Sequence, residues 1–315
     1  MKDGFNRNID YLRISLTNRC NLKCVYCMEE DTEFDHESIN KFLSTDDYKF
    51  IIKNMSKLGI KKIEFVGGET VLDLNLSELI YYAKNECNIE EIILTTNGIE
   101  FYKDAEKLKN AGLDQINIGI NSLKEYKYDS ITRGGNLGSV LKSFNTSLRL
   151  NINTNIDTLV IKNFNDDEIQ DFIELTKNFP ITLRFYELMR VGKFKNLFDA
   201  GYLNMVDFMN NIEGINKISS NDKICRYYYK VDNSKGKIDV VSKFNDSNCW
   251  SCNKISLSYD GKIKLCTYYD REYDILSFIN KPITFSEFMK DIILYKPKDF
   301  NEIKNNITSR EMNEI

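Results

Sequence analysis

The chain contains few of the residues that many metal sites, linkers and membrane spans require. Its 315 residues include one histidine (His36), one tryptophan and three prolines. With a single imidazole, any metal chemistry has to depend mainly on thiolates. No low-complexity linker divides the chain, and no run approaches the roughly 20 apolar residues that a membrane span needs. The first residues, MKDGFNRNIDYLR, also lack the apolar core of a signal peptide.

Charge and composition narrow the class of protein further. The formal net charge is −4, and 42% of the residues are hydrophobic. So mild a charge argues against coating nucleic acid or lying on a membrane surface, although a local basic pocket is compatible with it. The apolar content is ample for one large domain or two ordinary ones. We therefore expect a cytoplasmic protein without a nucleic-acid or membrane partner.

Short β-like runs alternate with longer amphipathic stretches over the first two-thirds of the chain. Helices are expected between the runs, as in TDDYKFIIKNMSKLG, which begins at a Thr45 cap and ends at Gly59. Strands separated by helices imply parallel βαβ units. The six expected strands are 11–16, 62–66, 91–95, 115–120, 153–161 and 181–187.

One face of these strands is polar, which is unusual for parallel strands buried on both sides. In 11–16, Leu12 and Ile14 share one face, while Arg13 and Ser15 share the other. In 181–187, Arg184 lies on the polar face. A solvated face is one explanation. We favour an α/β fold in which a six-stranded partial (β/α) barrel of the TIM type holds a polar ligand in its lumen, because a closed eight-stranded barrel fills its interior with bulky side chains.

The pattern changes near residue 200. One helix candidate is followed by two hairpins, RYYYKVDNSKGKIDVV and ISLSYDGKIKLC, the second turning at Asp260 and Gly261. We expect a barrel over 1–195 and a small C-terminal α+β extension over 196–315.

The cysteines fall into two groups of three. Cys20, Cys24 and Cys27 directly follow the first strand, where ligands bind in parallel α/β folds. The second group is Cys249, Cys252 and Cys266; Cys87 and Cys225 stand apart. Tight spacings in a reducing compartment favour metal ligation over disulfides. Three thiolates on a 4Fe–4S cluster leave one iron open, whereas a zinc site would need a fourth ligand such as His36.

CNLKCVYC resembles the CxxxCxxC loop of the radical S-adenosylmethionine (SAM) superfamily. GGE (67–69) follows the second strand and TTNG (95–98) follows the third, as in that superfamily. The resemblance implies that one cluster, held by the first three cysteines, binds and splits SAM to give a 5′-deoxyadenosyl radical. It also implies the residues that contact the cofactor. These are Tyr26, Gly67, Gly68, Glu69, Thr96 and Asn97.

Longer segments resemble the GTP 3′,8-cyclase (MoaA) family of molybdenum-cofactor biosynthesis. They include 7–28, 61–70, 163–169, 184–192 and 248–266. The resemblance implies a lyase with a second 4Fe–4S cluster on Cys249, Cys252 and Cys266, whose open iron binds the guanine of GTP. It implies a one-electron donor such as a flavodoxin or ferredoxin, and it is compatible with a homodimer. The substrate contacts implied are Arg13, Lys62, Arg184 and Lys254.

Several positions depart from that family. Lys254 and Ser256 stand where two arginines are usual, and Glu64 stands where a basic residue is often found. Gly119 and Asn121 replace a serine and an aspartate, and GGET replaces GGEP. The sequence given stops at SREMNEI, so the Gly-Gly tail of the family is either trimmed from it or absent. The loss of basic residues leaves open a paralogue with two clusters that acts on another nucleotide or on a peptide. A zinc-stapled binding protein is the alternative without catalysis.

Single residues also have structural alternatives. Arg13 and Arg184 are each compatible with an internal ion pair, and Lys62 with an exposed side chain. Cys87 is expected to be a packed thiol. Cys225 is either a core residue or a fourth cluster ligand that would close the second cluster to substrate.

Overall fold

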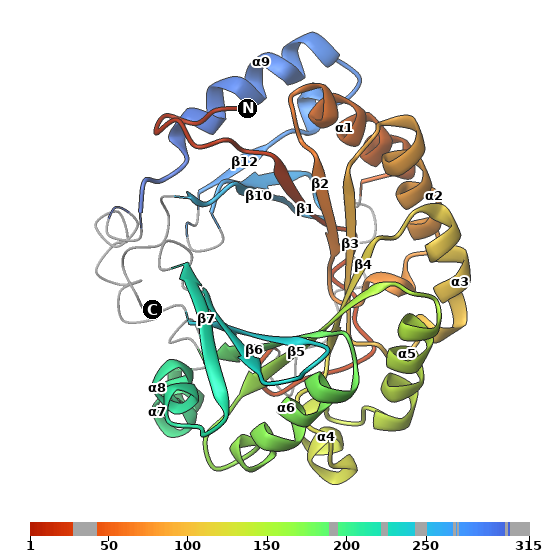
Figure 1. Cartoon of the computed structure of the whole chain (residues 1–315). Coiled ribbons are helices and arrows are strands. Elements are labelled where there is room, and N and C mark those ends of the chain that lie inside the picture. Colours follow the sequence, from red (N-terminus) through yellow and green to blue (C-terminus); the bar gives the residue numbers. More distant parts are fainter. Residues whose placement is uncertain are drawn as a thin grey trace.

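The computed structural model describes residues 1–27, 43–188, 195–221, 226–242, 251–266, 269, 271–299 and 302. His36, Cys225 and Cys249 lie outside these residues. A single curved sheet runs through the described chain in the order β12-β11-β10-β1-β2-β3-β4-β5-β6-β9-β8-β7. Figure 1 shows the sheet curling around an open centre, with helices along its outer side and a gap between its two ends.

The six expected barrel strands are all present. Each pairs in parallel with the next, so the predicted partial barrel is confirmed. The strands are β1 (Tyr11–Ser15), β2 (Lys62–Val66), β3 (Glu91–Thr96), β4 (Gln115–Gly119), β5 (Asn153–Val160) and β6 (Thr182–Glu187).

Helices connect these strands on the outside. Ser44 caps α1 in a reciprocal capping box with Asp47, one residue before the predicted cap. Gly59 follows α1 with a φ of 95°, which favours glycine. The helices are α1 (Thr45–Lys57), α2 (Leu76–Tyr81), α3 (Phe101–Ala111), α4 (Glu125–Thr132), α5 (Leu137–Arg149) and α6 (Ile169–Asn178). Short non-α turns follow or precede them at η2 (Thr70–Leu72), η3 (Tyr82–Glu86) and η4 (Asp166–Glu168).

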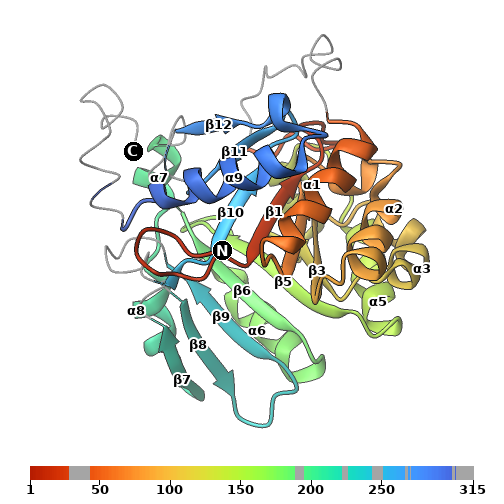
Figure 2. The same ribbon diagram turned by 90° about the horizontal axis from the view of Figure 1, so that it is seen from above.

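The C-terminal extension lengthens both edges of the same sheet. Both predicted hairpins form, β8 with β9 and β10 with β11. Strand β9 pairs in parallel with β6, and β10 pairs in parallel with β1, as Figure 2 shows from above. The elements are α7 (Lys195–Gly201), α8 (Met205–Asn210), β7 (Ile215–Asn221), β8 (Arg226–Val231), β9 (Lys237–Val241), β10 (Lys254–Leu257), β11 (Lys262–Lys264), β12 (Glu272–Asp274), η8 (Leu276–Phe278), α9 (Pro282–Ile292) and η9 (Ile293–Tyr295).

Apolar and polar side chains alternate along the strands, so one face of the sheet packs against the helices and the other lines a polar lumen. Leu12, Ile14, Ile63 and Phe65 are fully buried on the helix side, and each such side chain stabilises the fold by roughly 1.5–3 kcal/mol. The register places Arg13 beside Glu64 on the opposite, inner face. No helix among the described residues is long and apolar enough to cross a membrane.

Candidate active site

The loop after β1 carries the first three cysteines and is hydrogen-bonded to the end of α4. Its backbone amides at Lys23 and Val25 donate to carbonyls at the end of α4. Cys24 is half-buried, and none of the described cysteines is in a disulfide. Burial raises the pKa of Cys24 to about 11 and also raises those of Cys20 and Cys27. The loop thus presents three thiols whose ionisation has to be driven by the group they bind.

The donor set of this loop fits a cluster better than a single ion. Cys20, Cys24 and Cys27 supply three thiol ligands within eight residues of one loop. Iron–sulfur clusters are held by thiolates, whereas a four-coordinate zinc site would need a fourth ligand. The chemistry of this donor set therefore suits a 4Fe–4S cluster with one iron left open, and that these residues hold it stays a prediction.

Tyr26 is fixed next to Cys24. Its hydroxyl accepts a hydrogen bond of 2.6 Å from Asn121 Nδ2 and lies within hydrogen-bond reach of the Cys24 thiol. The Asn121 Oδ1 atom accepts from the amide of Leu159 at 2.9 Å. The asparagine that departs from the family pattern thus ties the cysteine loop to β5.

The GGE segment packs against the cysteine loop. The amides of Gly68 and Glu69 donate to the carbonyls of Thr17 and Arg19 at 2.8 and 2.7 Å. A Cβ atom at Gly68 would lie 2.2 Å from the Arg19 carbonyl oxygen. The glycine is therefore required by close approach of the protein's own backbone.

Glu69 holds the GGE and TTNG segments together. Its carboxylate is fully buried and accepts from Thr96 Oγ1 (2.6 Å), the Asn97 amide (2.6 Å) and the Val71 amide (3.1 Å). Burial raises the pKa of Glu69, and these three donors oppose the rise. Asn97 Nδ2 in turn donates to Asn21 in the cysteine loop at 2.7 Å. The predicted cofactor residues are thus one bonded unit, in which Glu69 is an internal brace.

The described part of the second cysteine group lies where β10 begins and β11 ends. Cys252 and Cys266 flank the same end of this hairpin. Lys296 is 2% exposed, donates to the carbonyls of Lys254 (2.8 Å) and Leu265, and lies within hydrogen-bond reach of Cys252. Burial would raise the pKa of Cys252, but the Lys296 ammonium holds it below its usual value. At this end of the hairpin, the Lys296 ammonium therefore favours the deprotonated, thiolate form of Cys252.

The two cysteine groups lie at opposite ends of parallel strands. Cys20 follows the carboxyl end of β1, whereas Cys252 precedes the amino end of β10, its parallel neighbour. Tyr11 and Lys254 share one register level, and Ser15 lies four residues farther along β1. Four residues of strand span about 13 Å. The polar lumen therefore separates the two groups by a distance that suits a small molecule.

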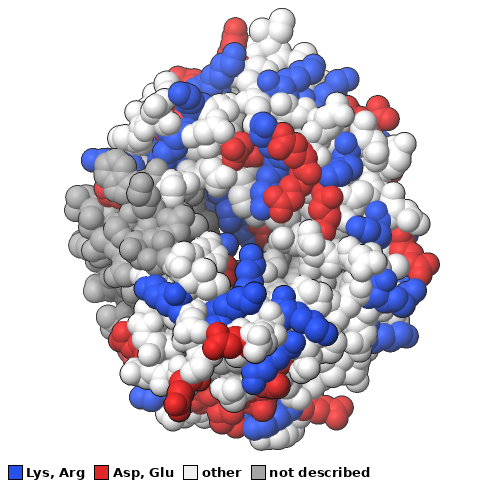
Figure 3. Space-filling model, in the orientation of Figure 1, with Lys and Arg blue, Asp and Glu red and all other residues white. Residues whose placement is uncertain are grey.

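Ion pairs line this lumen, and the pair of Arg184 with Asp157 is the most buried of them. Arg184 donates two hydrogen bonds to Asp157, at 2.5 and 2.7 Å. Arg13 Nε lies 2.9 Å from Glu64 Oε2, and Arg226 lies 3.4 Å from Asp239. Figure 3 shows that this face of the molecule is hollowed near its centre, where basic side chains are exposed.

Glu64 is the most strongly bonded of these carboxylates. Tyr11 and Thr95 donate to it at 2.6 and 2.8 Å. Burial alone would raise the pKa of Glu64, but Arg13 and Lys254 lower it to about 2. Burial lowers the pKa of Lys254 to about 8, and the nearby Glu64 limits the decrease. In the lumen, the negative charge of Glu64 is thus offset by the positive charges of Arg13 and Lys254.

Comparison with known proteins identifies the family. The Radical SAM superfamily matches residues 14–176, and Molybdenum Cofactor Synthesis C matches residues 181–302. GTP 3′,8-cyclase of Clostridium botulinum (strain Langeland) is 34% identical, over 96% of this chain and 95% of its own length. GTP 3′,8-cyclase of Clostridium perfringens (strain SM101) is 36% identical, over 96% and 94%. The chain belongs to the GTP 3′,8-cyclase family of radical SAM enzymes.

Solved structures agree on the radical SAM fold. The structure of native anSMEcpe with bound AdoMet has a TM-score of 0.57, with 16% identity over 90% of this chain and 84% of that one. Streptococcus suis SuiB has a TM-score of 0.56, with 13% identity over 84% of this chain and 62% of that one. Radical SAM enzymes of this family bind SAM and 4Fe–4S clusters, so the predicted cofactors are confirmed.

Three of the four predicted substrate contacts, Arg13, Lys62 and Arg184, lie beside carboxylates of this chain. Arg13 and Arg184 each face a carboxylate, as expected if they form internal ion pairs. Lys62 pairs with Glu91 at 2.8 Å and lies over the Tyr11 ring. That these residues contact substrate stays a prediction, as do the cluster ligands. Cys87 packs partly buried against the core, as expected.

Four residues of the site were not predicted. Asp157, Arg226, Asp239 and Lys296 carry contacts that the family motifs do not mark. Period-two alternation puts Asp157 on the inner face of β5, and the same count puts Asp239 on the inner face of β9. That signal was available in the sequence. Lys296 follows a helix far along the chain, and nothing local indicates its burial.

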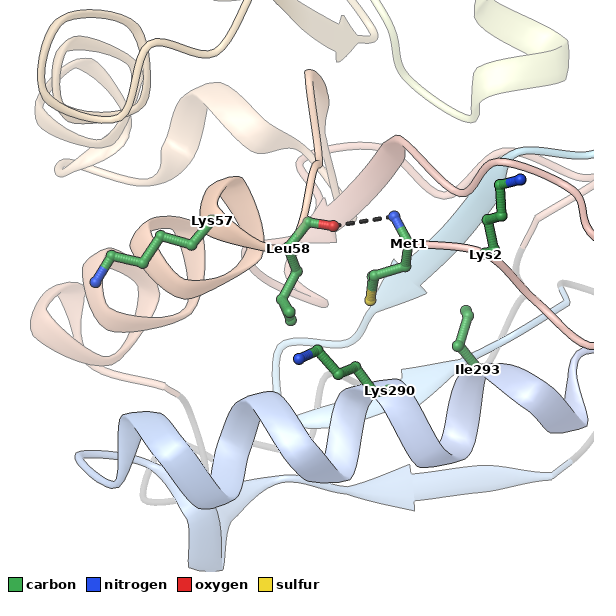
Figure 4. A pocket seen from close by; sticks show the side chains of 6 residues that line it. All are labelled: Met1, Lys2, Lys57, Leu58, Lys290 and Ile293. Carbon is green, nitrogen blue, oxygen red and sulfur yellow. Dashed lines mark hydrogen bonds between the residues drawn. The ribbon is translucent and has the colours of Figure 1, made fainter.

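A separate depression of about 310 Å³ lies away from the lumen. It is bounded by the chain start, the end of α1 and helix α9, and Figure 4 shows its six lining residues. The Met1 ammonium donates to the Leu58 carbonyl at 2.9 Å there. None of the predicted site residues lines it, so we assign it no part in the chemistry.

Proposed function

We propose that this chain uses a 5′-deoxyadenosyl radical to cyclise a guanine nucleotide held in the lumen, as the name of its relatives states for GTP. The observation that carries the proposal is that Cys20, Cys24 and Cys27 lie at one end of a polar lumen, and Cys252 and Cys266 lie at the other. A substrate that touches the second group would extend toward the first. Radical chemistry would then occur out of contact with bulk water.

Cys20, Cys24 and Cys27 would hold the first cluster. When bound, that cluster supplies the electron that splits SAM into methionine and the 5′-deoxyadenosyl radical. Tyr26 keeps Cys24 in place, and Glu69 fixes Thr96 and Asn97 beside the loop. The backbone of GGE and the side chain of Asn97 would orient SAM. In this role these residues would position SAM, and they would take no proton.

Cys252 and Cys266, together with Cys249, would hold the second cluster and present its open iron to the base. Lys254 lies between this end and the centre of the lumen, with its ammonium 4.7 Å from the centre of the Tyr11 ring. Arg13 and Asn117, which both lie against the Glu64 carboxylate, come next in the lumen. Their donors would orient the ribose so that one hydrogen faces the radical, which takes it and leaves as 5′-deoxyadenosine.

The electron would come from a flavodoxin or ferredoxin. Reduced thiols and an oxygen-sensitive cluster suit the cytoplasm, where we place the reaction. A homodimer is compatible with this proposal and contributes nothing to it.

Anaerobic incubation of the reconstituted protein with SAM, dithionite and a guanine nucleotide tests the proposal. The expected products are 5′-deoxyadenosine and a cyclised nucleotide that has the same mass as the substrate. The matched control is Cys27→Ala, which should form neither. If the unmodified holoenzyme forms no 5′-deoxyadenosine with any guanine nucleotide tested, the proposal is wrong.

A further inference from the structure

A buried ion pair near the start of the chain holds the segment that carries Lys296. Arg7 Nε donates to the carboxylate of Asp3, which also accepts from the Arg7 amide at 2.9 Å. Both side chains are buried. The terminal nitrogens of the guanidinium donate to three consecutive carbonyls, those of Lys296 (3.4 Å), Pro297 (2.7 Å) and Lys298 (3.0 Å). One forked guanidinium thus ties the chain after η9 to a carboxylate near the chain start.

The turn that carries this pair packs tightly against the same segment, as Figures 1 and 2 show for the start of the chain and the end of α9. A Cβ atom at Gly4 would lie 2.9 Å from the Leu294 carbonyl oxygen. Asn6 has a φ of 64°, and the Phe5 amide donates to Asp3 Oδ1 at 3.0 Å. A buried ion pair often adds little stability compared with apolar packing, which points to a role in positioning.

Lys296 extends this arrangement to the second cysteine group. Its ammonium donates to the Lys254 carbonyl on β10 and to the Leu265 carbonyl after β11. Leu265 directly precedes Cys266, and the same ammonium lies within hydrogen-bond reach of the Cys252 thiol. A single buried cation therefore bridges both sides of the hairpin end that bears the two cysteines.

The residues before β1 also hold the backbone next to Cys252 directly. Asn253 Nδ2 donates to Asp10 Oδ1 at 2.7 Å. The Tyr11 amide donates to the Asn253 carbonyl at 3.2 Å. The position of Cys252 is thus fixed from two sides, by Asn253 and by Lys296, and both connections lead back to the start of the chain.

We propose, resting on the proposed function above, that Arg7 is a positioning residue for the second cluster and acts through Lys296. By holding the backbone at 296–298, Arg7 keeps the Lys296 ammonium beside Cys252. Reduction adds one negative charge to a cluster, and hydrogen bonds and net charge around its sulfurs set its potential. The Lys296 ammonium would therefore favour the reduced form of a cluster held there.

A reductive titration of the Cys24→Ala protein with dithionite, followed by EPR spectroscopy, tests the inference. This anaerobically reconstituted variant should retain the second cluster without the first. Arg7→Lys in that background keeps a cation for Asp3 but loses the fork that reaches three carbonyls. We expect the ratio of reduced to oxidised cluster at a fixed potential to fall by about fivefold or more. The control is Arg149→Lys, which alters an exposed pair with Glu106. An unchanged ratio in folded Arg7→Lys would overturn the inference.

A double-mutant cycle separates an effect through Lys296 from a general structural effect. On the clusters that remain in Lys296→Met, Arg7→Lys should cause no further shift, because coupled residues are not additive. An equal shift in both backgrounds would contradict the inference.

If Arg7→Lys does not fold, Asp3→Asn decides, because it frees the guanidinium but keeps its donors. It should shift the ratio in the same direction by less, and no shift would contradict the inference. If the Cys24→Ala protein with Arg7 intact holds no cluster, the proposed second site is itself wrong, and the inference is wrong with it.

Discussion

Arg184 donates from Nε and from one terminal nitrogen to the two oxygens of Asp157, its register partner on the neighbouring strand. Asp157 lies in the barrel wall, so this forked pair is built into the lining of the lumen. Burial opposes the charge of Arg184, but Asp157 more than offsets it and raises the pKa of the guanidinium. The arginine predicted to bind substrate is therefore already part of the scaffold.

Asp157→Asn should destabilise the fold. It leaves a largely buried guanidinium without its counter-charge, which costs on the order of 3–5 kcal/mol. Added pyrophosphate should restore part of the loss, because a phosphate can replace the missing carboxylate. Urea unfolding with and without pyrophosphate measures both effects. Stability equal to that of the unmodified protein would show that the pair contributes little.

Cys24→Ala should abolish reductive cleavage of SAM while the C-terminal cluster remains. The loop of Cys20, Cys24 and Cys27 offers three thiols, so the loss of one leaves too few to hold its cluster. Cys87→Ala is the matched control, because that thiol packs against the core away from the loop. Normal formation of 5′-deoxyadenosine by Cys24→Ala would remove the loop from the mechanism.

Glu64 should stabilise the protein above pH 4.5 and lose that effect as the pH falls toward 2. Its pKa is about 2 in the folded chain, against an ordinary value of 4.5 for a glutamate in water, so the unfolded chain binds the proton first. The difference corresponds to about 3 kcal/mol at neutral pH. Urea unfolding of cluster-free protein and of Glu64→Gln between pH 3 and 7 should show curves that converge in acid. Parallel curves would contradict the ion pair with Arg13.

Lys296→Met should lower the iron content at the second site. The change leaves the carbonyls of Lys254 and Leu265 without their buried donor and removes the cation beside Cys252. The first cluster should remain, because its loop lies at the other end of the lumen. Lys290→Met, on the exposed side of α9, is the control. Full iron content in Lys296→Met would show that this lysine only fills space.

Much of the barrel could be predicted because its signals are local. The alternation of Leu12, Arg13 and Ile14 sets the two faces of β1 without reference to the rest of the chain. Helix α5 was not among the predicted helices, although its buried residues Leu137, Val140 and Phe144 recur at helical spacing. That signal was also local and was available in the sequence.

Like the fold, the candidate site has parts that local sequence patterns predict and parts that they do not. Cysteine spacing and the GGE and TTNG segments are local patterns, and the structure brings them together. The ion pairs depend on register between strands distant in sequence, as for Arg184 with Asp157. No local pattern specifies that pairing. The burial of Lys296 beside Cys252 likewise depends on how the chain after α9 returns to the hairpin.

Transfer of deuterium from a guanine nucleotide labelled at the ribose 3′ carbon is the most direct test of the account. The central claim is that a radical formed at the Cys20–Cys27 end reaches a nucleotide in the lumen. The account predicts deuterium in 5′-deoxyadenosine, seen by mass spectrometry, with the unmodified holoenzyme. Formation of 5′-deoxyadenosine without any deuterium from the labelled nucleosides and nucleotides would contradict it.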